Sequence, residues 1–135
     1  MLAVIADLYL PILGLFCVYY LRFQMGKKLA LSFMLAYFYV YVFAYIEFYF
    51  GWWLSMGADF SSHTAAVMVM VFALLSVNYK VGFYAFISML FYGLLMNVLH
   101  YHSWFDILTT VVVCLPCWGL FSIVNFTSSG RSLVR

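Results

Sequence analysis

Five apolar runs divide this chain from one end to the other, and only short polar breaks separate them. A transmembrane helix needs about 20 mostly apolar residues, because the hydrocarbon core of a bilayer is about 30 Å thick and a helix rises about 1.5 Å per residue. The sequence therefore predicts one domain over residues 1–135, an all-α integral membrane bundle of about five transmembrane helices. The runs cover about residues 2–21, 29–54, 63 to the NYK sequence at 78–80, 81–98 and 104–124.

Composition places the chain outside the soluble globular class. Of its residues, 69% are hydrophobic and 7% are charged, and its mean hydropathy is +1.10, whereas soluble domains carry about 25% charged residues. A formal net charge of +2 is too small to predict a nucleic-acid partner. The first run lacks a basic leader and a small-residue cleavage site, so we expect it to remain as a span.

The basic and acidic residues fall on opposite sides of the predicted spans. Cytosolic connections of multi-pass proteins are enriched in Lys and Arg, and the second and fourth connections contain neither. We therefore expect the N-terminus outside and the C-terminus in the cytosol, with the acidic face toward the periplasm or exterior. The small size fits a bacterial inner membrane, and the charge pattern is also compatible with an organelle membrane. The basic residues are Arg22, Lys27, Lys28, Lys80, Arg131 and Arg135, and the acidic residues are Asp7, Glu47, Asp59 and Asp106.

Two histidine motifs lie on the outer side in this topology. His63 opens the third run, and His102 with Asp106 opens the fifth, in the sequence LHYHSWFDIL. The starts of these two runs can be neighbours, because the chain crosses with the third run and returns with the fourth. A spacing of four places His102 and Asp106 on one face of a helix, while His100 points elsewhere. Ionisable residues at such depth predict a functional site.

The combination of residue types favours phosphoryl transfer. A histidine oriented by a carboxylate has its tautomer fixed and its far nitrogen made more nucleophilic, and a second histidine can protonate a leaving group. Helix N-termini and nearby hydroxyls suit a phosphate. We therefore predict chemistry through a phosphohistidine, with His63, His102 and Asp106 as the candidate catalytic residues. The predicted substrate-binding residues are Ser61, Ser62, Thr64, Asp59 and Glu47.

The same residues carry a family resemblance. The sequence SSHTA at 61–65 resembles the Ser-Gly-His-Thr motif of the type 2 phosphatidic acid phosphatase superfamily, and His102 with Asp106 is similar to its His, three residues, Asp motif. The GADF sequence at 57–60 and the HY sequence before His102 resemble the sphingomyelin synthase branch. The resemblance covers about half of the chain. It implies that His102 is the nucleophile, Asp106 its orienting carboxylate and His63 the acid for the leaving group.

The resemblance also implies a lipid substrate, either a phospholipid or an isoprenoid phosphate, and two departures bear on which ester it is. Met96 stands where the phosphatases carry an Arg six residues before the nucleophile, and Ser62 replaces the family's Gly. Without Lys or Arg on the outer side, a doubly charged monoester is poorly balanced beside Asp59 and Asp106. A phosphodiester carries less charge, so headgroup transfer between lipids suits these residues no worse than hydrolysis.

Two other functions stay open. One is a non-catalytic membrane subunit that binds lipid or stabilises a complex, working with a partner subunit or as a homo-oligomer. The other is a divalent metal site, because the HYH sequence at 100–102 together with His63, Asp59 and Asp106 offers nitrogen and oxygen ligands for zinc. That site requires the segment before Trp104 to be extended. Apart from this possible divalent metal, the sequence predicts no cofactor.

The CLPC sequence at 114–117 has the spacing of a redox pair. It lies well inside the fifth apolar run, however, and the third cysteine is in the first run. Buried thiols usually pack as small apolar groups. We therefore predict a packing role for Cys114 and Cys117.

Overall fold

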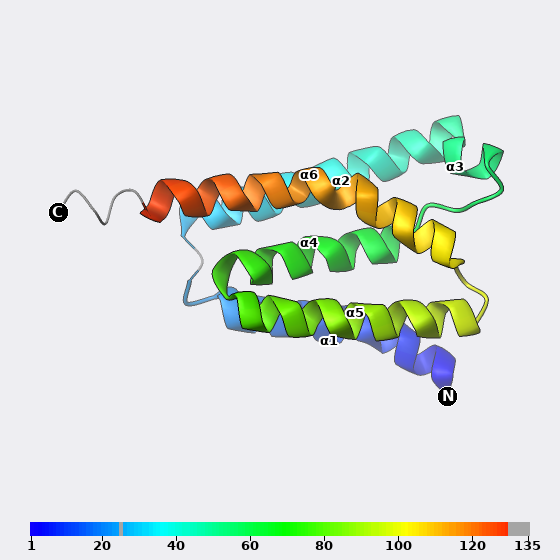
Figure 1. Ribbon diagram of the computed structural model, residues 1–135, viewed down its shortest axis with the longest axis horizontal. Coiled ribbons are helices and arrows are strands. Elements are labelled where there is room, and N and C mark those ends of the chain that lie inside the picture. The colour runs from blue at the N-terminus through cyan, green and yellow to red at the C-terminus, as the bar shows by residue number, and fades with distance from the viewer. Residues whose placement is uncertain (25, 130–135) are drawn as a thin grey trace.

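The computed structural model describes residues 1–24 and 26–129, and these form helices joined by short connections, with no strand among them. This confirms the predicted all-α class. Five long helices lie side by side, and one short helix caps an end of the bundle (Figure 1). The helices are α1 (Leu2–Leu21), α2 (Lys27–Phe50), α3 (Trp52–Ser55), α4 (Ser62–Val77), α5 (Tyr79–Val98) and α6 (Trp104–Ser129).

Helix α4 is the centre of the bundle. It packs against α1, α2, α5 and α6, and Figure 1 shows it running between the other long helices. The side chains of residues 64–69 and 71–74 are all buried. A helix that is apolar on every face is stable only when neighbours surround it, so the third predicted run forms the core around which the others assemble.

Four helices, α1, α2, α5 and α6, are long and apolar enough to cross a membrane. Helix α4 has 16 residues, so it is about 24 Å long, less than the roughly 30 Å of bilayer hydrocarbon. The outward faces of the bundle carry large apolar side chains, such as Phe38, Tyr41 and Tyr45 of α2. These features fit a multi-pass membrane protein. The five-span topology stays a prediction.

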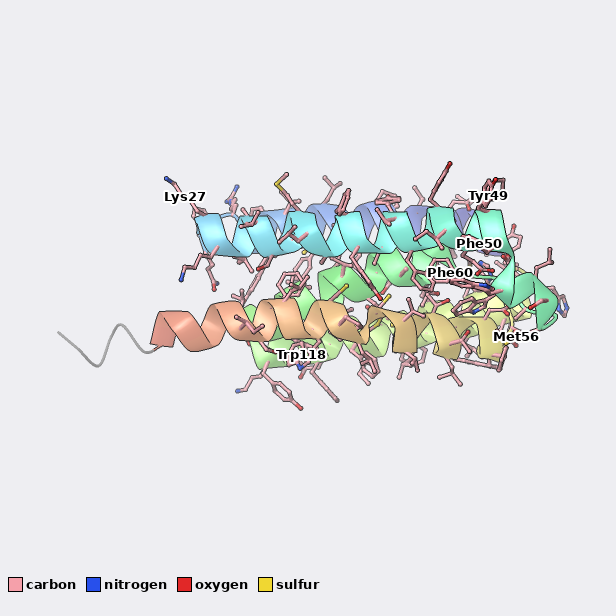
Figure 2. All side chains as sticks on the ribbon, turned by 90° about the horizontal axis from the view of Figure 1, so that it is seen from above. Lys27, Tyr49, Phe50, Met56, Phe60 and Trp118 are labelled. Atoms are coloured by element: carbon pink, nitrogen blue, oxygen red, sulfur yellow. The ribbon has the colours of Figure 1, made fainter. Side chains whose placement is uncertain are left out.

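The bundle has two ends of opposite charge. At one end, which we name the cationic end, lie Arg22, Lys27, Lys28 and Lys80, next to the α1–α2 and α4–α5 connections. At the other, the acidic end, lie Asp7, Glu47, Asp59 and Asp106, with the α2–α4 and α5–α6 connections. Figure 2 shows Lys27 and Met56 at these opposite ends. Arg131 and Arg135 lie outside the described residues. The charge separation agrees with the predicted orientation, which itself remains a prediction.

The connection between α4 and α5 is a single residue, Asn78. Its side-chain oxygen accepts hydrogen bonds from the backbone N–H groups of Lys80 at 3.1 Å and Val81 at 3.4 Å, so it caps α5. Gly82 then allows α5 to touch α4. A Cβ atom at this position would lie 2.4 Å from the Cα and N atoms of Leu75, so the close approach of the two helices requires glycine.

The cysteines are buried free thiols in the helices. Cys117 Sγ donates a weak hydrogen bond to the Ala36 carbonyl at 3.9 Å, across the contact between α6 and α2. This placement agrees with the predicted packing role of Cys114 and Cys117.

Candidate functional site

The second predicted run ends earlier than expected, at Phe50 instead of residue 54. Gly51 adopts a positive φ of 63°, which terminates α2 and starts the separate turn of α3. The buried carboxylate of Glu47 faces this turn. It accepts hydrogen bonds from the backbone N–H groups of Trp52 at 3.1 Å and Trp53 at 2.7 Å, so both oxygens of Glu47 are engaged in holding α3.

Aromatic packing holds α3 and the following loop against the bundle. The rings of Phe43, Trp53 and Phe60 contact one another pairwise, with centroids 5.4 to 5.7 Å apart. The indole N–H of Trp53 also donates a hydrogen bond to Thr109 Oγ1 of α6 at 2.8 Å. The residues that lead into α4 are therefore fixed on both α2 and α6.

Asp106 joins three segments at the acidic end. Its Oδ1 accepts a hydrogen bond from the backbone N–H of Asp59 at 2.9 Å, and its Oδ2 accepts one from the backbone N–H of Ser103 at 2.7 Å. The backbone N–H of Asp106 in turn donates to Ser103 Oγ at 3.2 Å. This reciprocal pair is a capping box that starts α6. Asp106 is 6% exposed, and both of its carboxylate oxygens accept hydrogen bonds from backbone N–H groups.

Ser61 and Thr64, both predicted to bind substrate, are buried at the start of α4. Ser61 Oγ donates to Thr64 Oγ1 at 2.9 Å and accepts from the Thr64 backbone N–H at 3.3 Å, which is an N-cap arrangement. The Ser61 backbone N–H donates to Thr110 Oγ1 of α6 at 3.2 Å. The two hydroxyls therefore cap the helix, whereas Ser62 is exposed. A substrate contact by any of the three stays a prediction.

The α5–α6 connection shows why His102 lies where it does. The backbone N–H of His100 donates to Asn97 O and that of Tyr101 donates to Met96 O, each at 3.0 Å, and His100 has a φ of 58°. This is a Schellman motif with histidine in the left-handed position. His102 follows it and precedes α6, so the predicted stacking of His102 and Asp106 on one helix face is wrong.

His102 nevertheless lies close to Asp106, because the capping box turns the chain back over the start of α6. The distance from His102 Nδ1 to Asp106 Oδ2 is 3.9 Å, which is too long for a hydrogen bond. The Nδ1 atom is buried and has no hydrogen-bond partner among the described residues. A shift of about 1 Å would bring it to hydrogen-bonding distance of the carboxylate.

His63 and His102 line one pocket at the acidic end, of about 320 Å³, which we name the histidine pocket. Helix α4 supplies His63, and the α5–α6 connection supplies His102. The pocket therefore joins the two motifs that are 39 positions apart in the sequence. The other lining residues are Ala6, Asp7, Asp59, Tyr92, Met96 and Tyr101.

Asp7 of α1 is a pocket residue that the sequence did not single out. It was assigned only to the outer side, and nothing in the pattern of the first run connects it with the histidines. The available signal is general, since a carboxylate within an apolar run is a functional candidate by default. Its placement on the histidine pocket wall raises the number of acidic lining residues to two, Asp7 and Asp59.

The remaining predicted residues belong to a neighbouring pocket of about 340 Å³, which we name the loop pocket. Glu47 and Ser62 line it together with Phe48 and Phe60. Asp59 lines both pockets and stands between them. The eight predicted residues thus all fall at the acidic end, but they divide between a histidine pocket, a loop pocket and the helix caps.

The structure gives the metal alternative no direct support. Within residues 1–24 and 26–129, no group of three His, Cys, Asp or Glu side chains is arranged to hold a metal ion. That alternative required an extended segment before Trp104, but residues 99–101 form a turn with His100 in the left-handed region, and His100 does not line the histidine pocket.

No known family model, curated protein or solved structure matches this chain. The phosphatase resemblance therefore stands on the motif residues of the sequence, and the function is argued from the pocket itself.

Proposed function

We propose that this chain is a membrane enzyme of lipid phosphoester chemistry, in which His102 is the nucleophile and His63 the general acid. The observation that carries the proposal is the shared pocket, since histidines from two separate motifs line one cavity at the acidic end. Nucleophile and acid must flank the same phosphorus atom to act in one step. A resident pair with that arrangement needs no cofactor.

The reaction has two steps. A ring nitrogen of His102 attacks phosphorus, the N–P bond forms, and the bond to the leaving oxygen breaks while His63 gives that oxygen its proton. In the second step, water or the hydroxyl of a second lipid attacks the phosphohistidine, returns a proton to His63 and releases His102. Water gives a phosphatase or phosphodiesterase, and a lipid hydroxyl gives a headgroup transferase.

Asp106 acts as a positioning residue in this scheme. With Nδ1 of His102 turned toward Asp106 at 3.9 Å, the other ring nitrogen, Nε2, is the one available for attack. Catalytic hydrogen bonds are often long without substrate and tighten in the bound complex. We expect the Nδ1–H to donate to Asp106 when substrate closes the pocket, which fixes the tautomer.

The charge of the pocket favours a singly charged ester. Asp7 and Asp59 line it, and the Lys and Arg residues of the described chain lie at the cationic end. A phosphodiester adds less repulsion than a doubly charged monoester. We therefore favour transfer or hydrolysis of a phospholipid headgroup at the non-cytosolic face, the side on which the positive-inside rule puts the acidic end. A bacterial inner membrane, with this face toward the periplasm, fits the small size of the chain.

A second candidate is a lipid-binding subunit without catalysis, acting with a partner subunit or a second copy of the chain. One observation favours it: Asp106, Ser61 and Thr64, which the enzyme hypothesis uses as functional groups, have their hydrogen bonds satisfied by helix caps. In this case the same fold binds lipid, but the histidines do not form a covalent intermediate.

A turnover assay separates the two. The purified protein in vesicles should release or exchange the headgroup of a radiolabelled phosphatidylcholine or phosphatidylethanolamine, and the H102A variant should be inactive. H100G is the matched control, because His100 occupies a left-handed position that glycine accepts and does not line the pocket. An inactive wild type with a broad panel of phospholipids and isoprenoid phosphates would favour the subunit.

A further inference from the structure

A row of apolar pockets follows the seam between α1 and α5, on the bilayer-facing side of the bundle. The pocket nearer the acidic end has a volume of about 310 Å³ and includes Ile5, Tyr9 and Leu95 in its lining. The next one, of about 310 Å³, includes Leu13, Phe16, Val81 and Ala85. Ser88 lines both, so the two pockets are adjacent along the seam, and we name them together the seam groove.

The seam groove borders the histidine pocket. Tyr92 lines the pocket at the acidic end of the groove and also the histidine pocket. Its ring stacks on Tyr9 with centroids 4.4 Å apart, and the Tyr9 hydroxyl shares a hydrogen bond of 2.8 Å with Ser88 Oγ. These contacts bridge α1 and α5 and pair polar groups of the seam with each other, so the remaining lining of the groove is mostly apolar.

The packing of α4 explains why the groove exists. Helices α1 and α5 both pack on α4, and they contact each other less than α5 contacts α4. The tight α4–α5 contact at Gly82 fixes α5 on the central helix. The outer surfaces of α1 and α5 leave two apolar pockets along the seam, and the Tyr9–Ser88 hydrogen bond crosses the seam between the two helices.

The dimensions of the seam groove match one hydrocarbon chain. From Val81 to Leu95 the wall of α5 is about 21 Å long, at about 1.5 Å per residue. One leaflet of bilayer hydrocarbon is roughly 15 Å deep, half of the roughly 30 Å core. Two apolar pockets that together extend further than a leaflet, next to a polar pocket with two histidines and two carboxylates, match the length and polarity of an amphiphile.

We propose that the seam groove binds one acyl chain of a membrane phospholipid whose headgroup lies in the histidine pocket. The identity of the headgroup rests on the proposed function, whereas the placement of the chain rests on the groove alone. The acyl chain would lie against Tyr92 near the glycerol and against Val81 and Phe16 near its end. Specificity for a long chain then comes from the buried apolar area along α1 and α5.

Photolabelling in vesicles tests this placement on the wild-type protein. The probes are two phosphatidylcholines with a diazirine on one acyl chain, either near the ester or at the chain end. The first should label peptides around Leu95 and Tyr92, and the second peptides around Val81 and Phe16. Labelling spread evenly over all bilayer-facing helices, or independent of the diazirine position, would overturn the proposal.

A filling variant gives a second, independent test. S88F places a ring where the two groove pockets meet, so it should abolish labelling of the seam by the chain-end probe. G119F is the matched control on α6, since a Cβ atom at Gly119 has nothing within 4 Å and the position is outside the seam. If S88F is folded by circular dichroism and still labels like the wild type, the chain does not lie in the groove.

The readout also separates this proposal from the proposed function. H102A removes the nucleophile and one lining residue of the histidine pocket but changes no residue of the seam groove, so labelling of the seam by the chain-end probe should persist while turnover is lost. Seam labelling by a wild-type protein that turns over no lipid supports the groove and contradicts the phosphoester chemistry. Turnover with even labelling of all helices supports the chemistry and contradicts the groove.

Discussion

Nδ1 of His102 lies 3.9 Å from Oδ2 of Asp106, while the same oxygen accepts a hydrogen bond of 2.7 Å from the backbone of Ser103. The Asp106 carboxylate therefore has a structural role, whether or not it also acts in catalysis. It starts α6 through a capping box and holds the loop before α4 through Asp59. An orienting role toward His102 has to coexist with these bonds.

This relationship changes what is expected of Asp106→Asn. The sequence alone predicts lost activity with folding nearly intact. An asparagine keeps one acceptor oxygen, so either Asp59 or Ser103 loses its partner for a buried N–H. We expect the free energy of unfolding to fall by about 1–3 kcal/mol, measured as a lower Tm in detergent. We also expect the variant to lose most of its activity. Asp59→Asn is the stability control, because Asp59 contributes its backbone to this bond. An unchanged Tm in Asp106→Asn would contradict the structural role.

Ser61 and Ser62 are adjacent serines with different expected effects. Ser61→Ala removes the N-cap of α4 and the partner of Thr64, and should lower stability by about 1 kcal/mol. Ser62→Ala changes an exposed side chain and should leave the free energy of unfolding within about 0.5 kcal/mol of the wild type. Thermal unfolding of the two variants checks this directly. Equal effects would show that Ser61 does not cap the helix.

Gly82→Ala tests the contact between α4 and α5. The new methyl group would meet the backbone of Leu75 at 2.4 Å, so the helices must separate, at a cost of about 1–3 kcal/mol or more. Gly119→Ala is the matched control, since the position has open space and alanine favours a helix by about 1 kcal/mol. Thermal unfolding should show opposite shifts for the two variants, and a stable Gly82→Ala would contradict the described packing.

Cysteine labelling tests the orientation of the bundle. Met56→Cys at the acidic end should react with an impermeant maleimide added from the non-cytosolic side, and Lys27→Cys should not. Native background is low, because Cys17, Cys114 and Cys117 are buried. Reaction of Lys27→Cys from the non-cytosolic side would show the opposite orientation, with the histidine pocket on the cytosolic side.

The sequence predicted the helices well where polar residues interrupt apolar runs. The first run ends at Leu21, before Arg22 and the lysines, and the fifth starts at Trp104, as the structure has them. The second run was extended too far because Trp52 and Leu54 continue its hydropathy. Gly51 ends the helix through its backbone conformation, which an apolar count does not register.

Tertiary relationships were harder to predict. The five runs have similar hydropathy, so nothing in the third run marked α4 as the central helix. The hydrogen bond from Asp59 to Asp106 uses a backbone N–H as its donor. Nearly every residue type has such a donor, so the amino-acid sequence cannot indicate this bond. The same is true of His100, whose left-handed conformation is set by the Schellman motif. The shared location of His63 and His102 could be predicted, because the topology alone brings the starts of their two runs to the same end of the bundle.

Trapping the covalent intermediate tests the central claim most directly. The purified wild type, H102A, H63A and the H100G control would each be incubated with a radiolabelled nitrophenyl phosphodiester and quenched in base, and the bound label tested for acid lability. The account predicts an acid-labile, base-stable phosphoenzyme in the wild type, H100G and H63A, because nitrophenolate leaves without a proton, and none in H102A. A phosphoenzyme of normal yield in H102A, or none in the wild type while lipid turnover proceeds, would contradict His102 as the nucleophile.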